Sequence, residues 1–344
     1  MNHVLERKNF YMMAVAFILS FGAIAIIMKF SGYQGLKDVM NINPIYIGIV
    51  LLFVFLSLLV DTYRIRDLLL ALGEDLSVGY LFKFNLATFF FGYITPFGSG
   101  ALPITIYLLN KKKIPPNKSL MIFTAKILFS GIFFGTIPPI LLIFFRKQLE
   151  LTHALSIFAI LVSFILLILL IGLVYIILRP AFLISVVNLI AGIRFFSGER
   201  YKKFFENTKT EIIEYNHRFN ELFMVSSGGK LLISQLLYAM LFWTLFYSIA
   251  PILMIAMNIK FNILAVISRQ IIFYDILAYN VIPSGAGFVE VGFASIFSNI
   301  VPHHLLGVFI GIWRFFTYYV YLIASGIGFF LMMRKDTDKP LGAE

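Results

Sequence analysis

Residues 281–290 read Val-Ile-Pro-Ser-Gly-Ala-Gly-Phe-Val-Glu and interrupt a hydrophobic run with the pattern Pro-x-Gly-x-Gly. Proline removes a backbone donor and glycine frees the backbone, so we expect a helix to break here. Residues 95–101 read Thr-Pro-Phe-Gly-Ser-Gly-Ala and repeat the pattern 187 residues earlier. Two helix breaks at corresponding places in two halves of a chain point to a membrane transport site. The breaking residues are Pro96, Gly98 and Gly100 in the first stretch and Pro283, Gly285 and Gly287 in the second.

The composition indicates that the chain folds in lipid. Of its 344 residues, 60% are hydrophobic and 13% are charged, whereas soluble domains carry about 25% charged residues. Several apolar runs reach the roughly 20 residues that a bilayer-spanning helix needs. We therefore predict an all-α polytopic membrane protein, with residues 1–344 forming a single integral membrane domain.

Apolar periodicity and length predict about six full spans. A charged loop is expected at Asp61–Asp75, and an amphipathic helix lying in the membrane interface is expected at Arg200–Phe223, where aromatic residues recur at helical spacing. The predicted spans are Phe10–Phe30, Pro44–Val60, Ser119–Phe145, Leu151–Leu178, Leu231–Met257 and Leu305–Met333.

The two broken segments are predicted to be re-entrant hairpins. The apolar stretch after each break has roughly 10 to 14 residues, which at about 1.5 Å each is too short to cross a core of about 30 Å. We expect hairpins at Val78–Asn110 and Phe261–Ile300. They belong to an internal repeat of residues 78–146 and 261–333, with breaks at 95–101 and 282–288.

The distribution of basic residues predicts the orientation. With the N-terminus in the cytoplasm, 20 of the 28 Lys and Arg residues fall in cytoplasmic loops and five in the opposite loops. This asymmetry favours cytoplasmic N- and C-termini in a plasma membrane. The first hairpin then opens inwards and the second outwards, as an inverted repeat requires.

Five charged residues fall inside apolar runs and are the candidate binding residues. An ionised side chain at the membrane centre costs about 2.5–3.5 kcal/mol on insertion scales, so these groups need one another, water or a ligand. Three are basic and two are acidic, which leaves a net positive interior suited to an anion. The five residues are Lys126, Arg269, Asp275, Glu290 and Arg314.

The second break offers an anion site because a helix starting near Gly287 presents unpaired N–H groups. Glu290 stands in its first turn, where it either meets a substrate or pairs with Arg314 in a structural role. Lys126 either faces the site or extends to the interface. The residues alone leave both alternatives open.

Other function classes find little support in the residues. The net charge of +11 lies at the ends of apolar runs, which does not favour nucleic acid binding. The chain has no cysteine, and the pair His303-His304 has no third ligand nearby, so we expect no metal site and no cofactor. No recognised catalytic constellation is present, and we do not expect an enzyme.

The second break also resembles the Pro-x-Gly-Gly-x-Gly-x-x-Glu signature of the lysylphosphatidylglycerol synthase transmembrane-region family. Arg314 followed by Tyr318-Tyr319, and Thr95-Pro96-x-Gly98-x-Gly100, extend the resemblance over about residues 10–333. The resemblance implies a flippase that moves charged-headgroup lipids between leaflets, without the aminoacyl-transferase domain of fused members. Two departures are Ser284-Gly285 in place of Gly-Gly, and Ala101-Leu102-Pro103 where many members carry an acid.

The leading hypothesis is a translocase for a charged-headgroup phospholipid or glycolipid. In this hypothesis Arg269, Arg314 and Lys126 hold phosphate, and Glu290 meets a cationic group. An ion-coupled transporter of a small anionic solute is the alternative, and an accessory subunit of a lipid-modifying or glycosyl-transferring enzyme is a third class. Membrane lipids are the expected partners, with a homo-oligomer or a partner enzyme left open.

Overall fold

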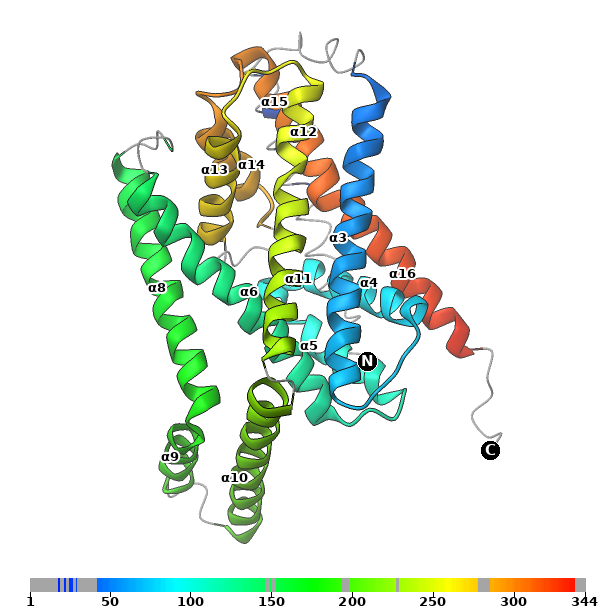
Figure 1. The fold of residues 1–344 in the computed structure, drawn as a ribbon, viewed down its shortest axis with the longest axis vertical. Helices are drawn as coiled ribbons and strands as arrows, with labels where there is room; N and C mark the ends of the chain where they lie inside the picture. Colours follow the sequence, from blue (N-terminus) through cyan, green and yellow to red (C-terminus); the bar gives the residue numbers. More distant parts are fainter. Residues whose placement is uncertain are drawn as a thin grey trace.

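The computed structural model describes residues 42–145, 149, 153–193, 198–226, 229–277 and 285–337, with a few single positions between 18 and 29. Every regular element within these ranges is a helix, and the helices form an elongated bundle (Figure 1). The predicted all-helical class is confirmed for this part of the chain. The predicted first span, residues 10–30, lies outside the described residues except for those single positions.

Five helical stretches in the described ranges are long and apolar enough to cross a membrane. They coincide with the other five predicted spans. They are α3 (Pro44–Ala71), α6 (Pro116–Phe144), α8 (His153–Leu178), α11 (Lys230–Tyr247) continued by α12 (Ile249–Ala256), and α15 (His303–Arg314) continued through a π-helical turn (Phe315–Tyr319) into α16 (Val320–Thr337).

The structure corrects the prediction of a charged loop after the second span. Helix α3 continues to Ala71, and Asp61 and Arg64 lie on its buried face with 3% and 2% of their surface exposed. Leu68 and Leu69, farther along the helix, are also buried. Helical periodicity thus persists through the charged stretch, which the apolar run alone did not reveal.

The first predicted break is confirmed residue by residue. Helix α4 (Val78–Ile94) ends at Thr95, a short 3-10 turn covers Pro96–Gly98, and α5 (Ala101–Asn110) follows. The hydroxyl of Thr95 donates to the carbonyl oxygen of Phe91 at 2.6 Å and accepts the N–H of Gly100 at 2.8 Å. One side chain therefore satisfies backbone groups from both short helices, which stabilises the turn between them.

The second break lies between α13 (Ile263–Leu277) and α14 (Phe288–Phe297). Residues 278–284, including Pro283, lie outside the described residues. Gly285 and Gly287 both adopt positive φ values, 66° and 81°, which glycine adopts far more readily than other residues. Helix α14 starts directly after Gly287, as predicted. In Figure 1, α13 and α14 lie toward the end of the bundle opposite α9 and α10.

The polar segment folds into two helices at one end of the bundle (Figure 1). Helix α10 (Glu199–Asn220) confirms the predicted amphipathic helix, with Phe205 and Phe219 buried and the basic side chains elsewhere on its surface. Helix α9 (Pro180–Ala191) was not predicted. Pro180 ends α8 but also occupies the first turn of α9, where its missing N–H and fixed φ are favourable.

Helices α4 and α16 pack closely because glycine faces leucine between them. A Cβ atom at Gly328 would lie 2.5 Å from Leu86 Cδ1 and 2.6 Å from Leu86 Cβ. Leu86 Cβ is bonded to the backbone of α4, so it cannot move away unless that helix moves. The absence of a side chain at position 328 therefore sets the distance between the first hairpin and the last helix.

We expect Gly328→Ala to destabilise the protein by about 1–3 kcal/mol, because an added methyl group overpacks this contact. Thermal unfolding of the purified protein in detergent measures the effect. Gly48→Ala on α3 is the control, since a Cβ atom there meets nothing within 4 Å. Equal midpoints for the two variants would contradict the packing argument.

Candidate functional site

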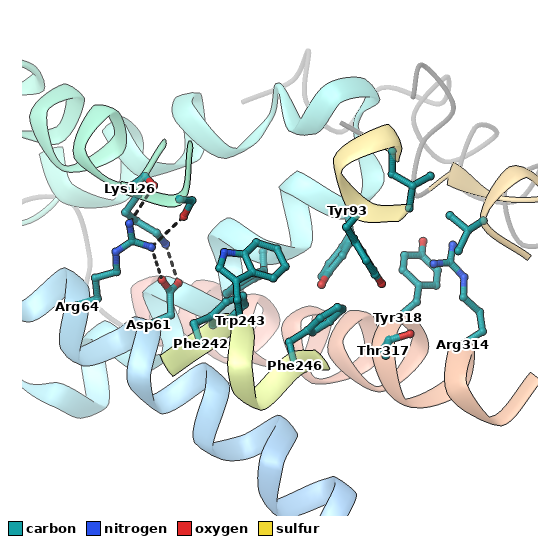
Figure 2. Close-up of a pocket in the computed structure, with 15 residues that line it drawn as sticks. Asp61, Arg64, Tyr93, Lys126, Phe242, Trp243, Phe246, Arg314, Thr317 and Tyr318 are labelled. Carbon is teal, nitrogen blue, oxygen red and sulfur yellow. Dashed lines mark hydrogen bonds and ion pairs between the residues drawn. The ribbon is translucent and has the colours of Figure 1, made fainter. Parts of the chain in front are cut away.

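A cavity of about 320 Å³ lies where α3, α4, α6, α11, α13, α14 and the α15–α16 helix meet. Figure 2 shows charged groups at both ends, with Asp61, Arg64 and Lys126 at one end and Arg314 at the other. Aromatic rings form the wall between these ends. The aromatic lining residues are Phe89, Tyr93, Phe242, Trp243, Phe246, Tyr274 and Tyr318.

The first end of the cavity is built around the carboxylate of Asp61. Lys126 Nζ lies 2.7 Å from Asp61 Oδ2, and Arg64 NH1 lies 3.7 Å from Asp61 Oδ1. The side chain of Asp61 is 4% exposed, whereas that of Lys126 is 24% exposed. Lys126 therefore combines a buried counter-ion with a side chain that lines the cavity.

Arg64 is held by partners from two further helices. Its guanidinium donates to the carbonyl oxygen of Lys126 at 2.9 Å, to Ser130 Oγ at 3.2 Å and to Gln235 Oε1 at 3.3 Å. These contacts tie α3 to α6 and α11. Asn85 connects α4 to α3 as well, since its side chain donates to the carbonyl oxygen of Leu58 on α3 at 3.3 Å.

The opposite end of the cavity is formed by Arg314. Its Nε donates to Glu290 Oε1 at 2.9 Å, and its guanidinium lies over the ring of Tyr318, 4.4 Å from the centroid. Glu290 Oε2 accepts the backbone N–H of Gly287 at 2.7 Å. Glu290 thus binds the second helix break to α15, and its own side chain is not among those that line the cavity.

The structure brings two of the five predicted site residues, Lys126 and Arg314, into one cavity. They lie 188 residues apart, one more than the 187 residues that separate matched positions of the two breaks. Each therefore stands at nearly the same place in its half of the chain, on the long helix that follows its hairpin. A third predicted residue, Glu290, is the direct partner of Arg314.

Arg269 and Asp275 lie elsewhere in the structure. The guanidinium of Arg269 donates to the carbonyl oxygens of Leu149 and Ile296 at 2.8 and 2.7 Å and to Asn299. Asp275 faces α8, where Ser163 donates to it. Both are buried, but neither side chain lines the cavity.

Two residues of the site, Asp61 and Arg64, were expected in a charged loop and were therefore not among the candidate binding residues. Their three-residue spacing, directly after the apolar run of α3, is compatible with one helical face and is the signal that was available. Asp61 also accounts for a departure noted in the sequence. No acid follows the first break, and the carboxylate beside Lys126 comes from α3 instead.

The charges of the site leave an excess of one positive charge. Asp61 and Glu290 are formally negative, whereas Arg64, Lys126 and Arg314 are formally positive. A buried net charge is unfavourable in a low-dielectric environment unless a counter-ion is present. The cavity is thus electrostatically suited to a ligand carrying one negative charge.

A second, mainly apolar cavity of about 370 Å³ adjoins the first. The two share Phe89, Tyr93, Lys126 and Ser130 as lining residues. The second cavity extends between the first hairpin and α6. Gly98, Ala101 and Thr105 line it on one side, and Ile122, Phe123 and Ile127 on the other.

Spans, broken hairpins and buried ion pairs together define a multi-pass helical membrane protein. Residues 12–325 match the family described as the lysylphosphatidylglycerol synthase TM region, and the chain belongs to this family. It is also similar to a "UPF0104 membrane protein" of Archaeoglobus fulgidus, with 23% identity over 277 residues. That alignment covers 78% of this chain and 82% of the relative. The resemblance inferred from the sequence is confirmed.

We expect a double-mutant cycle of Asp61→Asn and Lys126→Gln to give a larger coupling energy than the same cycle of Glu74→Gln and Lys118→Gln. Removing one partner of a buried pair costs about 3–5 kcal/mol, whereas exposed pairs contribute about 0–1 kcal/mol. The Glu74–Lys118 pair is a matched control, because Lys118 also lies on α6 and is 25% exposed, close to the 24% of Lys126, whereas Glu74 is 27% exposed and Asp61 only 4%. Unfolding in detergent measures both cycles, and equal couplings would show that the burial of Asp61 does not strengthen its pairing with Lys126.

Proposed function

We propose that the protein is a lipid translocase whose cavity binds a phosphate-bearing headgroup. The observation that carries the proposal is that a positively charged cavity and a mainly apolar one are neighbours and share Lys126 in their lining. A phospholipid or a phosphate-linked glycolipid has the same division into an anionic part and an apolar part. Membership of the family supports this function class but does not identify the lipid.

The charge of the cavity supports a phosphodiester. The three cations exceed the two anions by one, and a phosphodiester supplies one negative charge. Lys126 is the cation best placed to bind it, because Arg64 is already held by neutral partners on α6 and α11. Arg314 binds from the opposite end, and Glu290 positions it. Arg269 is left out of the proposed site, because its guanidinium donates to backbone carbonyls.

The apolar cavity supports a lipid over a small solute. A transporter of a free anion needs a polar chamber but no adjoining apolar space, whereas a lipid needs room for at least the first part of an acyl or isoprenoid chain. The wall beside Lys126 consists of Ile122, Phe123 and Ile127 on α6. The headgroup then lies between the ion pairs while its chain extends along the first hairpin.

Translocation by this protein uses the two halves of the chain alternately. The hairpins are re-entrant in opposite senses, and the N- and C-termini are cytoplasmic. Lys126 and Arg314 occupy corresponding places in the two halves and face one cavity from opposite ends. A headgroup held by one cation therefore passes to the other as the halves move. No catalytic step on the lipid is involved.

We expect Lys126→Gln to slow lipid translocation about ten- to a hundredfold. A hydrogen bond to a charged group contributes about 1.5–3 kcal/mol, and each 1.4 kcal/mol corresponds to a factor of ten. Fluorescent phosphatidylglycerol in proteoliposomes, quenched from the outer leaflet, reports the rate. Lys118→Gln on the same helix is the matched control and should retain the wild-type rate. The proposed site is wrong if both variants behave like the wild type.

The alternative, a transporter of a small anionic solute, is favoured by one feature, the charged cavity between the two ion pairs. Ala101→Leu separates the two functions, because it fills the apolar cavity without changing a charge. A lipid translocase should lose about tenfold or more of its phosphatidylglycerol transport, as expected when about 1–3 kcal/mol of steric strain is introduced. Ala101→Ser is the control, because serine is nearly as small as alanine and leaves the apolar cavity unfilled. Uptake of inorganic phosphate by the wild type, unchanged in Ala101→Leu, would instead support the small-solute transporter.

A further inference from the structure

Asp275 is a buried carboxylate that the proposed lipid site does not use. It lies on α13, has no exposed surface, and accepts a hydrogen bond from Ser163 Oγ of α8 at 2.5 Å through Oδ2. Its other oxygen, Oδ1, is buried without a hydrogen-bond partner in the described part of the chain. A buried acceptor in this state is costly, which calls for an explanation.

Among the described residues, Asp275 differs from the buried acids Asp61 and Glu290 in having no cation paired with it. Asp61 pairs with Lys126, and Glu290 pairs with Arg314, whereas none of the ion pairs between described residues involves Asp275. An ionised carboxylate isolated in a low-dielectric environment is unfavourable, so it binds a cation or a proton.

The surroundings of Asp275 contain few other charges. Helices α8 and α12 contain no Asp, Glu, Lys or Arg. Helix α6 carries Lys118 and Lys126, which pair with Glu74 and Asp61, respectively. Tyr247 of α11 is a titratable group on a facing helix that interacts electrostatically with Asp275, and Tyr274 is adjacent on α13 itself. Elsewhere around it, Arg269 donates to backbone carbonyls and Glu290 of α14 is held by Arg314.

A proton fits this site better than a metal ion. The described residues contain no group of three or more His, Cys, Asp or Glu side chains that would hold a metal. Ser163 suits a proton site because its hydroxyl both donates and accepts. It donates to the ionised carboxylate, and it accepts from the carboxylic acid after a proton has formed an O–H bond with Asp275. No other bond is made or broken.

The position of Asp275 connects this site to the cavity. Tyr274 and Leu277, on the same short helix, line the cavity, while Asp275 faces α8. Helix α13 then leads into the second break, after which Glu290 positions Arg314. A change of charge at Asp275 therefore acts on the helix that forms both the cavity wall and the first arm of the second hairpin.

We propose that Asp275 is a proton-binding site that couples lipid translocation to a proton gradient. This inference rests on the proposed function only for the coupling, since proton binding is a property of the purified protein. Binding neutralises the carboxylate and weakens its contact with Ser163. Helix α13 is then free to move against α8.

Infrared difference spectroscopy of the full chain in lipid nanodiscs tests proton binding directly. We expect a carboxylic-acid C=O band that grows as the pH falls, shifts in D2O, is absent in Asp275→Asn and is displaced in Ser163→Val. The exposed carboxylate of Asp75, 72% exposed, provides the control variant Asp75→Asn, which should retain the band. A wild-type spectrum without a titrating band that Asp275→Asn removes would overturn the proton site.

Translocation in proteoliposomes tests the coupling. A proton gradient should accelerate wild-type transport of fluorescent phosphatidylglycerol, and Asp275→Asn should translocate at one rate with or without the gradient. A variant that still responds to the gradient, or a wild type that responds to a sodium gradient instead, would overturn the coupling while leaving the lipid site intact. If the wild type moves no lipid, the coupling fails together with the proposed function, and the infrared titration still decides the proton site.

Discussion

The ion pair between Asp61 and Lys126 is the interaction on which the centre of the molecule depends. Lipid offers no water to stabilise a charge, so each charged side chain inside the bundle requires a partner from the protein. The partners of Asp61 and its neighbour Arg64 come from α3, α6 and α11. Neutralising these charges therefore fixes the relative positions of helices that are far apart in the sequence.

In each half of the chain a carboxylate neutralises the cation that lines the cavity, but the two carboxylates come from different kinds of position. In the second half the acid stands in the first turn of α14 and also accepts the N–H of Gly287, so hairpin and cation are joined by one side chain. In the first half the hairpin is closed by Thr95, and the acid belongs to α3, which precedes that hairpin. The two cations thus stand on the long helices that follow the two breaks, whereas their counter-ions come from dissimilar places in the chain.

Much of the fold was predictable because lipid imposes simple length and polarity rules. Five spans, the two breaks and the burial of Arg314 follow from apolar run lengths and from the positions of proline and glycine. The sequence could not reveal that α3 continues past Asp61, because a charge after an apolar run predicts a loop equally well. It also could not place Arg269, since the carbonyl oxygens that need a donor are determined by tertiary packing.

The π-helical turn at Phe315–Tyr319 makes the number of residues in the last helix part of the site. A π turn contains one residue more than an α turn. The extra residue is absorbed within the turn, so the helix beyond it keeps nearly the orientation that a continuous α-helix would have, and Tyr321 stays beside Ser57 on α3, with its hydroxyl 2.5 Å from Ser57 Oγ. Loss of one residue from the α-helical part of α16 would instead rotate everything beyond it by about 100°. A one-residue deletion inside the π turn would therefore change mainly the turn itself, whose Thr317 and Tyr318 line the cavity.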